Sequence, residues 1–149
     1  MKILLVASGG GHLAQLLTLR SWWSRYDRHW VTFNQQDAVS ALEGEGVTWA
    51  HFPVTRNIPN AVRNLGLAVT TIWRERPDVV VSTGAGVSLP FFVIARFFRI
   101  RTVYIEVFDR ISSPTLTGRL SYPLSDAMCG QWPEQRALYP EAVLIGPAL

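Results

Sequence analysis

Residues 76–91 read RPDVVVSTGAGVSLPF, and the order of residue types in this stretch decides the fold class. Pro77 ends the helical pattern before it, because proline lacks the N–H that a helix interior needs. The apolar, β-branched run Val79–Ser82 predicts a strand covered on both faces. A glycine turn follows, and Pro90 falls in the first turn of the next expected helix. A buried strand, a glycine turn and a helix in this order are typical of a parallel α/β sheet.

The same alternation runs through the rest of the chain. We expect strands at Ile3–Ala7, Trp30–Phe33, Val47–Phe52, Val79–Ser82, Thr102–Ile105, Ala127–Cys129 and Val143–Ile145. We expect helices at Leu13–Trp23, Gln36–Leu42, Asn60–Arg74, Leu89–Phe98, Thr115–Ser121 and Glu134–Leu138. In the third helix, apolar residues spaced by three and four form one face, namely Val62, Leu65, Val69 and Ile72. The pattern predicts one doubly wound, Rossmann-like sheet of about seven strands, a single domain over residues 1–149.

Composition narrows the classes of protein that fit. Of the 149 residues, 48% are hydrophobic and 17% are charged, so the chain can bury a core and is not disordered. A single cysteine, Cys129, excludes an internal disulfide framework, so we expect a reducing cytosol and an inert, packed thiol. The net charge of +3 is too small to indicate nucleic acid binding. Except for Lys2 the basic side chains are all arginine, which suits phosphate or carboxylate ligands, although a codon bias would give the same composition.

The sequence favours contact with a membrane over a span across it. The longest apolar stretch, Val87–Ile100, is interrupted by Arg96 and Arg99. On a helical wheel Phe92 shares a side with both arginines, a pattern found at lipid headgroups but also on a core helix with a solvated edge. The loop TRNIPN (55–60), with Arg56 and Asn57, mixes cations with apolar tips and is a candidate for binding a lipid diphosphate.

The first expected strand ends in the glycine loop Ser8, Gly9, Gly10, Gly11 and His12. Glycines expose backbone amides, and a helix N-terminus adds a field that favours an anion such as phosphate. A nicotinamide-dinucleotide-binding enzyme is also open, since the G-x-G-x-x-A spacing is present. The acidic residue that would bind the ribose is missing after the second strand, where Asp37 comes late. A helix N-terminus disfavours protonated His12, so the imidazole is a candidate base; capping the loop is the alternative.

Two further loops follow expected strands at the same sheet edge. A second glycine turn before a helix consists of Thr83, Gly84, Ala85 and Gly86. It predicts a phosphate site, with a close-packed turn as the alternative. Glu106, Asp109 and Arg110 follow the fifth strand, and a carboxylate there can accept sugar hydroxyls or act as a base. An ion pair between Asp109 and Arg110 that fixes the loop is the alternative. The chain has no metal-ligand spacing, Walker lysine or D-x-D pair, so we expect neither metal nor cofactor.

Seven motifs carry a family resemblance that runs nearly from end to end. They are SGGGHLAQL (8–16), WVTF (30–33), TRNIPN (55–60), RPDVVVSTGAGVSLPF (76–91), YIEVFDR (104–110), PTLTGRLSYPLSD (114–126) and QWPEQ (131–135). The chain resembles the bacterial PssD/CpsF-type polysaccharide glycosyltransferase subunits. It is similar to the membrane-associated subunit of the split eukaryotic N-acetylglucosaminyltransferase of lipid-linked oligosaccharide synthesis, and more remotely to the N-terminal half of MurG.

This resemblance implies the acceptor-side half of a GT-B glycosyltransferase divided between two polypeptides. A small partner subunit would bind the UDP-sugar, and a polyprenyl-diphosphate-linked saccharide of exopolysaccharide or capsule synthesis would be the acceptor. His12 matches a histidine proposed as base or phosphate contact, and Glu106 matches a carboxylate near the acceptor site. Gly84 and Gly86 match the second glycine loop, and Gly146–Leu149 would lead toward the separate donor half.

The resemblance also implies a place in the cell, the inner face of the cell membrane. The eukaryotic relatives carry an N-terminal membrane anchor, whereas Met1 and Lys2 lead directly into the first strand. We therefore expect peripheral attachment through a surface patch or through the partner. Apart from the dinucleotide enzyme, the remaining alternative is a membrane scaffold that recruits the catalytic subunit and contributes no reacting group.

Overall fold

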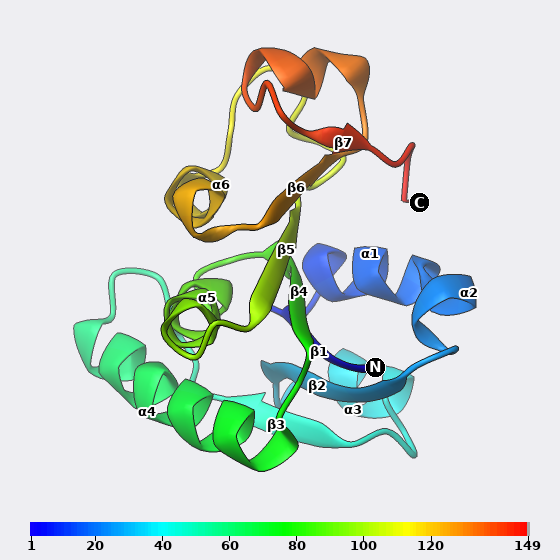
Figure 1. Cartoon of the computed structure of the whole chain (residues 1–149). Helices are drawn as coiled ribbons and strands as arrows, with labels where there is room; N and C mark the ends of the chain where they lie inside the picture. The colour runs from blue at the N-terminus through cyan, green and yellow to red at the C-terminus, as the bar shows by residue number, and fades with distance from the viewer. Residues whose placement is uncertain (149) are drawn as a thin grey trace.

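A computed structural model describes residues 1–148, and Leu149 lies outside the described residues. Seven parallel strands form one sheet in the order β3-β2-β1-β4-β5-β6-β7 (Figure 1). The strands are β1 (Lys2–Ala7), β2 (Asp27–Phe33), β3 (Val47–Ala50), β4 (Val79–Gly84), β5 (Arg101–Ile105), β6 (Ala127–Gly130) and β7 (Val143–Leu144). Every expected strand is present, and the strand order is that of a doubly wound, Rossmann-like sheet.

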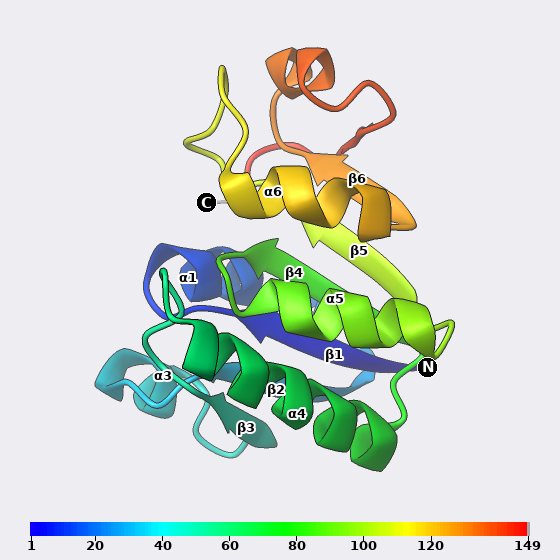
Figure 2. The same ribbon diagram turned by 90° about the vertical axis from the view of Figure 1, so that its left-hand side faces the viewer.

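Helices lie on both faces of this sheet. They are α1 (Gly11–Thr18), α2 (Arg20–Trp23), α3 (Gln36–Ala41), α4 (Ile58–Glu75), α5 (Ser88–Phe97) and α6 (Leu116–Ser121). The first three cover one face and the last three cover the other (Figures 1 and 2). The helix expected over Leu13–Trp23 is split at Leu19, whose N–H bonds the carbonyl of Leu16. The segment expected as a helix at Glu134–Leu138 is the 3₁₀ turn η2 (Pro133–Ala137), and a second turn, η1, covers Tyr122–Leu124.

The core consists of two apolar layers separated by the sheet. Alternate side chains of β1 point to opposite faces, because the side-chain period of a strand is two. Leu4 and Val6 pack with Phe91 and Phe92 of α5, whereas Leu5 packs with the α1 and α2 side. The centre of the sheet is therefore buried on both faces, as its continuous apolar strands predict.

The apolar face predicted for α4 forms, but most of it faces solvent. Val62 is 64% exposed, and Ile72 alone of the four predicted residues is buried. Polar residues pack toward the sheet instead: the Asn64 side chain accepts a hydrogen bond from His51 N (2.8 Å) and donates one to His51 O (3.0 Å). The exposed stripe of α4 consists of Ile58, Val62, Leu65, Val69 and Trp73.

The shared face predicted for Phe92, Arg96 and Arg99 is wrong. Phe92 is fully buried, with its ring 6.1 Å from the ring of Tyr104. The exposed aromatic residues of this segment lie at the end of α5, where Phe97 is 79% exposed. Within residues 1–148, no helix combines the length and the apolar character needed to cross a membrane.

An ionic cluster ties β1 to the end of α4. Glu75 accepts hydrogen bonds from Lys2 Nζ (2.8 Å) and Arg74 Nε (2.7 Å), and His29 Nδ1 lies 3.7 Å from its carboxylate. Burial alone would raise the pKa of Glu75, but the bonds from Lys2 and Arg74 and the nearby His29 lower it to about 2. Burial lowers the pKa of His29. The cluster stabilises the sheet at the end opposite to the glycine loops.

Candidate functional site

The two glycine loops meet where the strand order of the sheet reverses. β1 and β4 are neighbours, and Ala7 is paired with Gly84 at their carboxyl ends. Figure 2 shows the arrowheads of both strands at the same edge of the sheet, beside the start of α1. Ligands of open α/β sheets bind at this kind of switch point. The prediction that both glycine loops face the same edge of the sheet is therefore confirmed.

His12 joins the two loops. Its Nδ1 donates to the carbonyl oxygen of Thr83 (2.8 Å), and the Thr83 hydroxyl donates to the carbonyl oxygen of His12 (2.6 Å). A carbonyl can only accept, so the proton of a neutral ring is held on Nδ1 and the lone pair is left on Nε2. The same histidine thus ties the loops together and offers a proton acceptor.

The carboxylate of Asp37 closes the first glycine loop. Gly10, at φ +67°, donates its N–H to Asp37 Oδ2 (3.1 Å). A Cβ at Gly9 would meet the side-chain amide of Gln35, the far end of a flexible side chain that can move aside. Ser8 donates its hydroxyl to the carbonyl of Gly9 (3.3 Å). Asp37 is late in the sequence for a ribose contact, yet the fold brings it to the loop, where it occupies one of the amides predicted to bind phosphate.

The second glycine loop is a tightly packed turn. Gly84 adopts φ +111°. A Cβ there would be 2.5 Å from the Tyr104 hydroxyl oxygen and 3.4 Å from Cε1 of His12. Its N–H donates to Ser82 Oγ (2.9 Å), and Ala85 follows at φ +65°. At Gly86 a Cβ would be 3.2 Å from Val54. These contacts match the close-packed alternative, and phosphate binding at this loop stays a prediction.

Glu106 is enclosed and does not open to solvent. Its side chain is 0% exposed, and Oε2 accepts a 2.6 Å hydrogen bond from the Tyr139 hydroxyl. Oε1 accepts from Thr115 Oγ1 (3.3 Å) and from the N–H of Val107 (3.1 Å). Burial and this hydrogen bond raise the pKa of Tyr139, so its hydroxyl remains a donor. The carboxylate therefore accepts hydrogen bonds that fix the loop after β5 from inside. Its role as a base stays a prediction.

Three buried glutamines fix the loop that follows Glu106, and the sequence analysis did not single them out. Gln135 Nε2 donates to the carbonyls of Val107 (3.2 Å) and Arg110 (3.0 Å). Gln131 Nε2 donates to the carbonyl of Glu106 (2.9 Å) and to Gln15 Oε1 (2.8 Å). Two of them stand in the QWPEQ motif, which was noted only as part of the resemblance.

The ion pair considered for Asp109 and Arg110 is wrong for the part of the chain that the structure describes. Both side chains are exposed, and none of the salt bridges found joins them. The loop is held through its backbone instead, which leaves both charged side chains available to a ligand.

A small cavity of about 180 Å³ lies between the first glycine loop and the loop after β5. Its lining consists of Gly11, His12, Gln15, Val107, Phe108, Asp109, Arg110 and Thr115. Arg56 and Asn57 are not part of it. Asn57 caps α4 by accepting a hydrogen bond from Asn60 N (2.9 Å), and Arg56 is exposed at φ +51°. The structure thus brings together Gly11, His12, Asp109 and Arg110 from the predicted site.

Comparison with known proteins shows which family the chain belongs to. Residues 50–148, more than half of the chain, match the family described as oligosaccharide biosynthesis protein Alg14 like. The chain belongs to the Alg14-like family. It is 27% identical over 178 aligned positions to the UDP-N-acetylglucosamine transferase subunit ALG14 of Rattus norvegicus, covering 98% of this chain and 82% of the relative.

A second, shorter similarity involves a bacterial enzyme. Over 91 positions this Alg14-like chain is 32% identical to the UDP-N-acetylglucosamine--N-acetylmuramyl-(pentapeptide) pyrophosphoryl-undecaprenol N-acetylglucosamine transferase of Syntrophotalea carbinolica. The match covers 60% of this chain and 25% of that protein. The resemblances to the eukaryotic subunit and to MurG are therefore confirmed.

Solved structures share the fold of the Alg14-like chain. The crystal structure of Acinetobacter baumannii MurG superposes with a TM-score of 0.75 at 16% identity, covering 89% of this chain and 42% of MurG. UDP-GlcNAc 2-epimerase from Neisseria meningitidis, bound to UDP-GlcNAc, gives 0.78 at 12% identity, covering 99% and 47%. The chain spans less than half the length of either protein, and identities this low establish the fold alone.

Proposed function

We propose that this chain is the acceptor-side half of a split glycosyltransferase. The reaction moves glucuronate, glucose or N-acetylglucosamine from a UDP-sugar to a polyprenyl-diphosphate-linked saccharide in exopolysaccharide or capsule synthesis. A second subunit supplies the UDP-sugar site, and the pair works peripherally on the inner face of the membrane. Support comes from the names of two relatives, one a transferase subunit and the other a transferase with a pyrophosphoryl-undecaprenol substrate.

The free Nε2 of His12 beside the cavity is the observation that carries this proposal. In an inverting displacement, the acceptor hydroxyl gives its proton to Nε2 while its oxygen attacks the anomeric carbon and UDP leaves. The bond from Nδ1 to Thr83 O holds the ring in the tautomer that this step needs. Asp109 and Arg110 would bind hydroxyl and phosphate groups of the acceptor. The reaction as proposed uses no metal and no cofactor.

The size of the cavity supports a site shared between two chains. Small-molecule sites usually enclose roughly 300–1,000 Å³. The cavity beside His12 holds about 180 Å³ and is open to solvent, too small for an acceptor and a nucleotide together. A partner placed against this sheet edge would enclose the rest.

The exposed stripe of α4 is the proposed membrane contact. Ile58 is 78% and Trp73 68% exposed on a convex helix surface, which suits the apolar boundary of a lipid layer. Arg63 is exposed on the same helix beside the stripe and complements anionic headgroups. Val62→Glu should reduce cosedimentation with phosphatidylglycerol vesicles at least fivefold, whereas Ser40→Glu, at an exposed position of α3 on the other face of the sheet, should not. Equal binding by the two variants would exclude this face.

The direct test is transfer of labelled sugar from UDP-sugars to a membrane lipid acceptor. Three preparations are compared: this chain, the second subunit, and both co-expressed. Activity confined to the mixture would establish the divided site and identify the donor. Full activity of either chain alone would contradict it.

A membrane scaffold without a reacting group is the second candidate. The enclosure of Glu106 favours it, because His12 is then the one predicted catalytic group that reaches the cavity. A complex that transfers sugar normally with His12→Ala would support the scaffold. The Asp37 carboxylate on Gly10 N argues against a dinucleotide in the first glycine loop.

A further inference from the structure

Gln15 is a buried side chain with a hydrogen-bond donor that the protein itself leaves unused. The residue is 6% exposed, and it lines the cavity beside His12. Its Oε1 accepts hydrogen bonds from Gln131 Nε2 (2.8 Å) and from the N–H of Phe108 (3.3 Å). Within residues 1–148, its Nε2 donates to no partner. Because a buried donor without a partner costs free energy, a ligand that accepts from Nε2 would be stabilised here.

The orientation of this amide is fixed by groups that can only donate or only accept. A backbone N–H can only donate, so Phe108 requires the oxygen of Gln15 and not its nitrogen. The Gln131 amide is fixed in the same way. Its Oε1 accepts from the N–H of Ala148 (2.7 Å), and its Nε2 donates to the carbonyl of Glu106 (2.9 Å). Exchanging oxygen and nitrogen in either amide would place two donors or two acceptors face to face, so the NH₂ group of Gln15 has one orientation.

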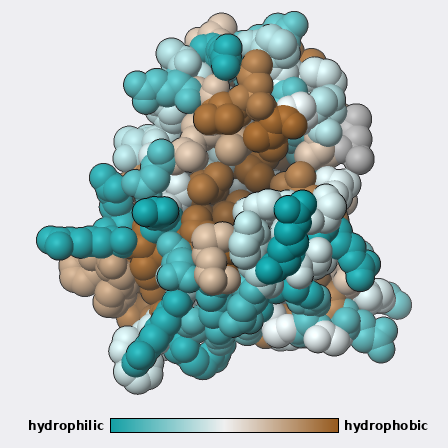
Figure 3. All heavy atoms as spheres, turned by 45° about the vertical axis from the view of Figure 1, so that its right-hand side comes forward, coloured by the Kyte–Doolittle hydropathy of each residue, from teal (hydrophilic) through white to brown (hydrophobic). Residues whose placement is uncertain are grey.

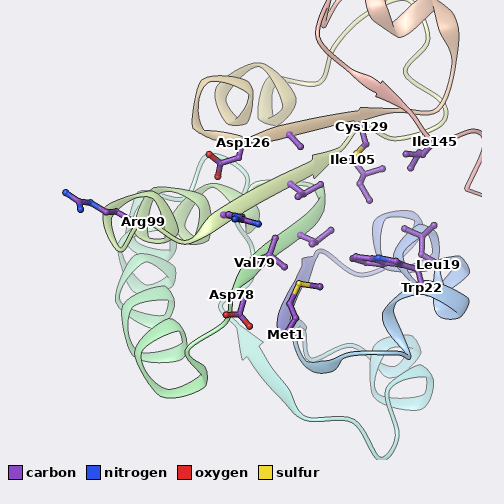
Figure 4. A pocket seen from close by; sticks show the side chains of 14 residues that line it. Met1, Leu19, Trp22, Asp78, Val79, Arg99, Ile105, Asp126, Cys129 and Ile145 are labelled. Carbon is purple, nitrogen blue, oxygen red and sulfur yellow. The ribbon is translucent and has the colours of Figure 1, made fainter.

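The far end of this series of hydrogen bonds is held by the segment after β7. Figure 3 shows apolar atoms gathered in a hollow on this side of the molecule. Ile145 and Cys129 line the same side of this groove (Figure 4). The N–H of Ile145 donates to the carbonyl of Gly130 (2.9 Å), and Ala148 is 5% exposed. The segment is thus tied to the end of β6 at two points, which holds the N–H that orients Gln131.

The free NH₂ group of Gln15 opens to the cavity. In the described residues, the side-chain atoms that are sealed from solvent without a partner are those of Thr32, Thr71 and Ser121. Gln15 Nε2 is not among them, so it keeps contact with solvent, and the cavity of about 180 Å³ is the space that this residue lines. His12 stands three residues earlier in α1, so the two side chains share a helix face with their Cβ atoms about 5–6 Å apart. A ligand the size of one sugar ring can reach both.

The other groups at the cavity indicate a saccharide. The Asp109 carboxylate accepts hydrogen bonds from hydroxyl groups, and the neutral amide of Gln15 suits a hydroxyl oxygen. The Phe108 ring is 37% exposed and offers a flat apolar surface to a sugar ring. Its backbone is held on both sides, because its N–H bonds Gln15 and its carbonyl accepts from Trp132 Nε1 (2.6 Å). A phosphate would instead favour the guanidinium of Arg110.

We infer that Gln15 Nε2 donates a hydrogen bond to a hydroxyl oxygen of the terminal sugar of the acceptor, while another hydroxyl of that sugar gives its proton to His12. The inference rests on the proposed function, which places an acceptor saccharide in this cavity. Gln15 then determines specificity. A sugar that lacks this hydroxyl, or carries it in the inverted configuration, would leave the buried donor unpaired and would be rejected.

The variant Gln15→Glu removes the free donor alone. Its carboxylate keeps an oxygen for Phe108 N and Gln131 Nε2, so the contacts that fix the loop stay. In the co-expressed pair, we expect the KM for the membrane lipid acceptor to rise at least tenfold and the KM for the UDP-sugar to stay within twofold. A carboxylate one turn from His12 favours the protonated imidazole, so each chain is measured at its own pH optimum. Ser40→Glu adds the same charge at an exposed position of α3 and should change neither KM.

A second measurement uses this chain alone. The five glutamine side chains are isotope-labelled, and the amide signal that Gln15→Glu removes is assigned to Gln15. The probes are glucosyl, galactosyl and N-acetylglucosaminyl geranyl diphosphate, with geranyl diphosphate as the reference. We expect at least one glycosyl probe to shift the Gln15 signal and the reference to leave it in place. An equal shift with the reference would identify a phosphate ligand, and no shift with any probe would leave Gln15 a structural role; either result overturns the inference.

The two measurements separate this inference from the proposed function. If the pair transfers sugar but Gln15→Glu has the acceptor KM of the wild type, the saccharide contact fails and the split transferase stands. If the pair is inactive while a glycosyl probe alone shifts the Gln15 signal, the saccharide contact stands and the split transferase fails.

Discussion

Replacing Tyr139 by phenylalanine tests the buried hydrogen bond that holds Glu106. The Tyr139 hydroxyl donates to Glu106 Oε2 over 2.6 Å, and both side chains are buried. A hydrogen bond to a charged group contributes about 1.5–3 kcal/mol, and water cannot replace this donor without entering the core. We expect Tyr139→Phe to lower the free energy of unfolding by about 2 kcal/mol. For a chain of this length that corresponds to a melting temperature lower by roughly 4–8 °C.

Chemical denaturation of purified chains measures the loss, with Tyr122→Phe as the control. The Tyr122 ring packs 5.2 Å from the Tyr139 ring, but its hydroxyl makes no hydrogen bond within residues 1–148. The control should stay within about 0.5 kcal/mol of the wild type. In a Glu106→Gln background the loss from Tyr139→Phe should shrink to about 1 kcal/mol, because the acceptor is then neutral. A Tyr139→Phe chain as stable as the control would refute the enclosure of Glu106.

Three further predictions follow from the site and the fold. His12→Ala should reduce sugar transfer by the assembled complex at least ~100-fold, because it removes the base. The melting temperature should fall by only about 2–4 °C, the loss expected for the one hydrogen bond to Thr83; loss of the fold would contradict the role as a base. Because the pKa of Glu75 is lowered from 4.5 to about 2, its stabilisation of up to about 3 kcal/mol is present above pH 4.5 and is lost as the pH falls toward 2. Urea midpoints should therefore fall more steeply there for the wild type than for Glu75→Gln, and parallel curves would contradict this. Gly118→Ala should lower the free energy of unfolding by more than about 2 kcal/mol, because a Cβ there collides with Glu106 and the Tyr139 hydroxyl. Gly66→Ala should raise it by up to about 1 kcal/mol, because this exposed position of α4 has open space for a Cβ. Thermal melts that rank the two variants otherwise would contradict the packing.

The strands could be predicted from sequence because their signal is local. Continuous apolar runs such as Val79–Ser82 are buried on both faces, and all seven expected strands are present. The apolar spacing in α4 gave the right helix but did not mark its buried face. Asn64 packs against the sheet because it satisfies both backbone groups of His51, and spacing within one helix carries no information about such a partner.

The candidate site depended on contacts between distant segments, which local patterns do not reveal. Glu106 follows a strand, where a carboxylate is usually accessible, but Tyr139 closes over it from 33 positions further along the chain. Gln131 reaches Gln15 across 116 positions, and Asp37 reaches Gly10 across 27. The position of both glycine loops at one edge of the sheet was predictable, because it needs only parallel strands. The hydrogen bond that joins them, from His12 to Thr83, links residues 71 positions apart and was not predicted.

The exposed apolar stripe of α4 bears on how much of this protein a cell can accumulate. Exposed apolar surface of this kind is recognised by chaperones and proteases, and small changes in stability alter abundance several-fold. Chains produced in excess over the surface that covers this stripe would be degraded, and the surplus would not persist as an idle pool.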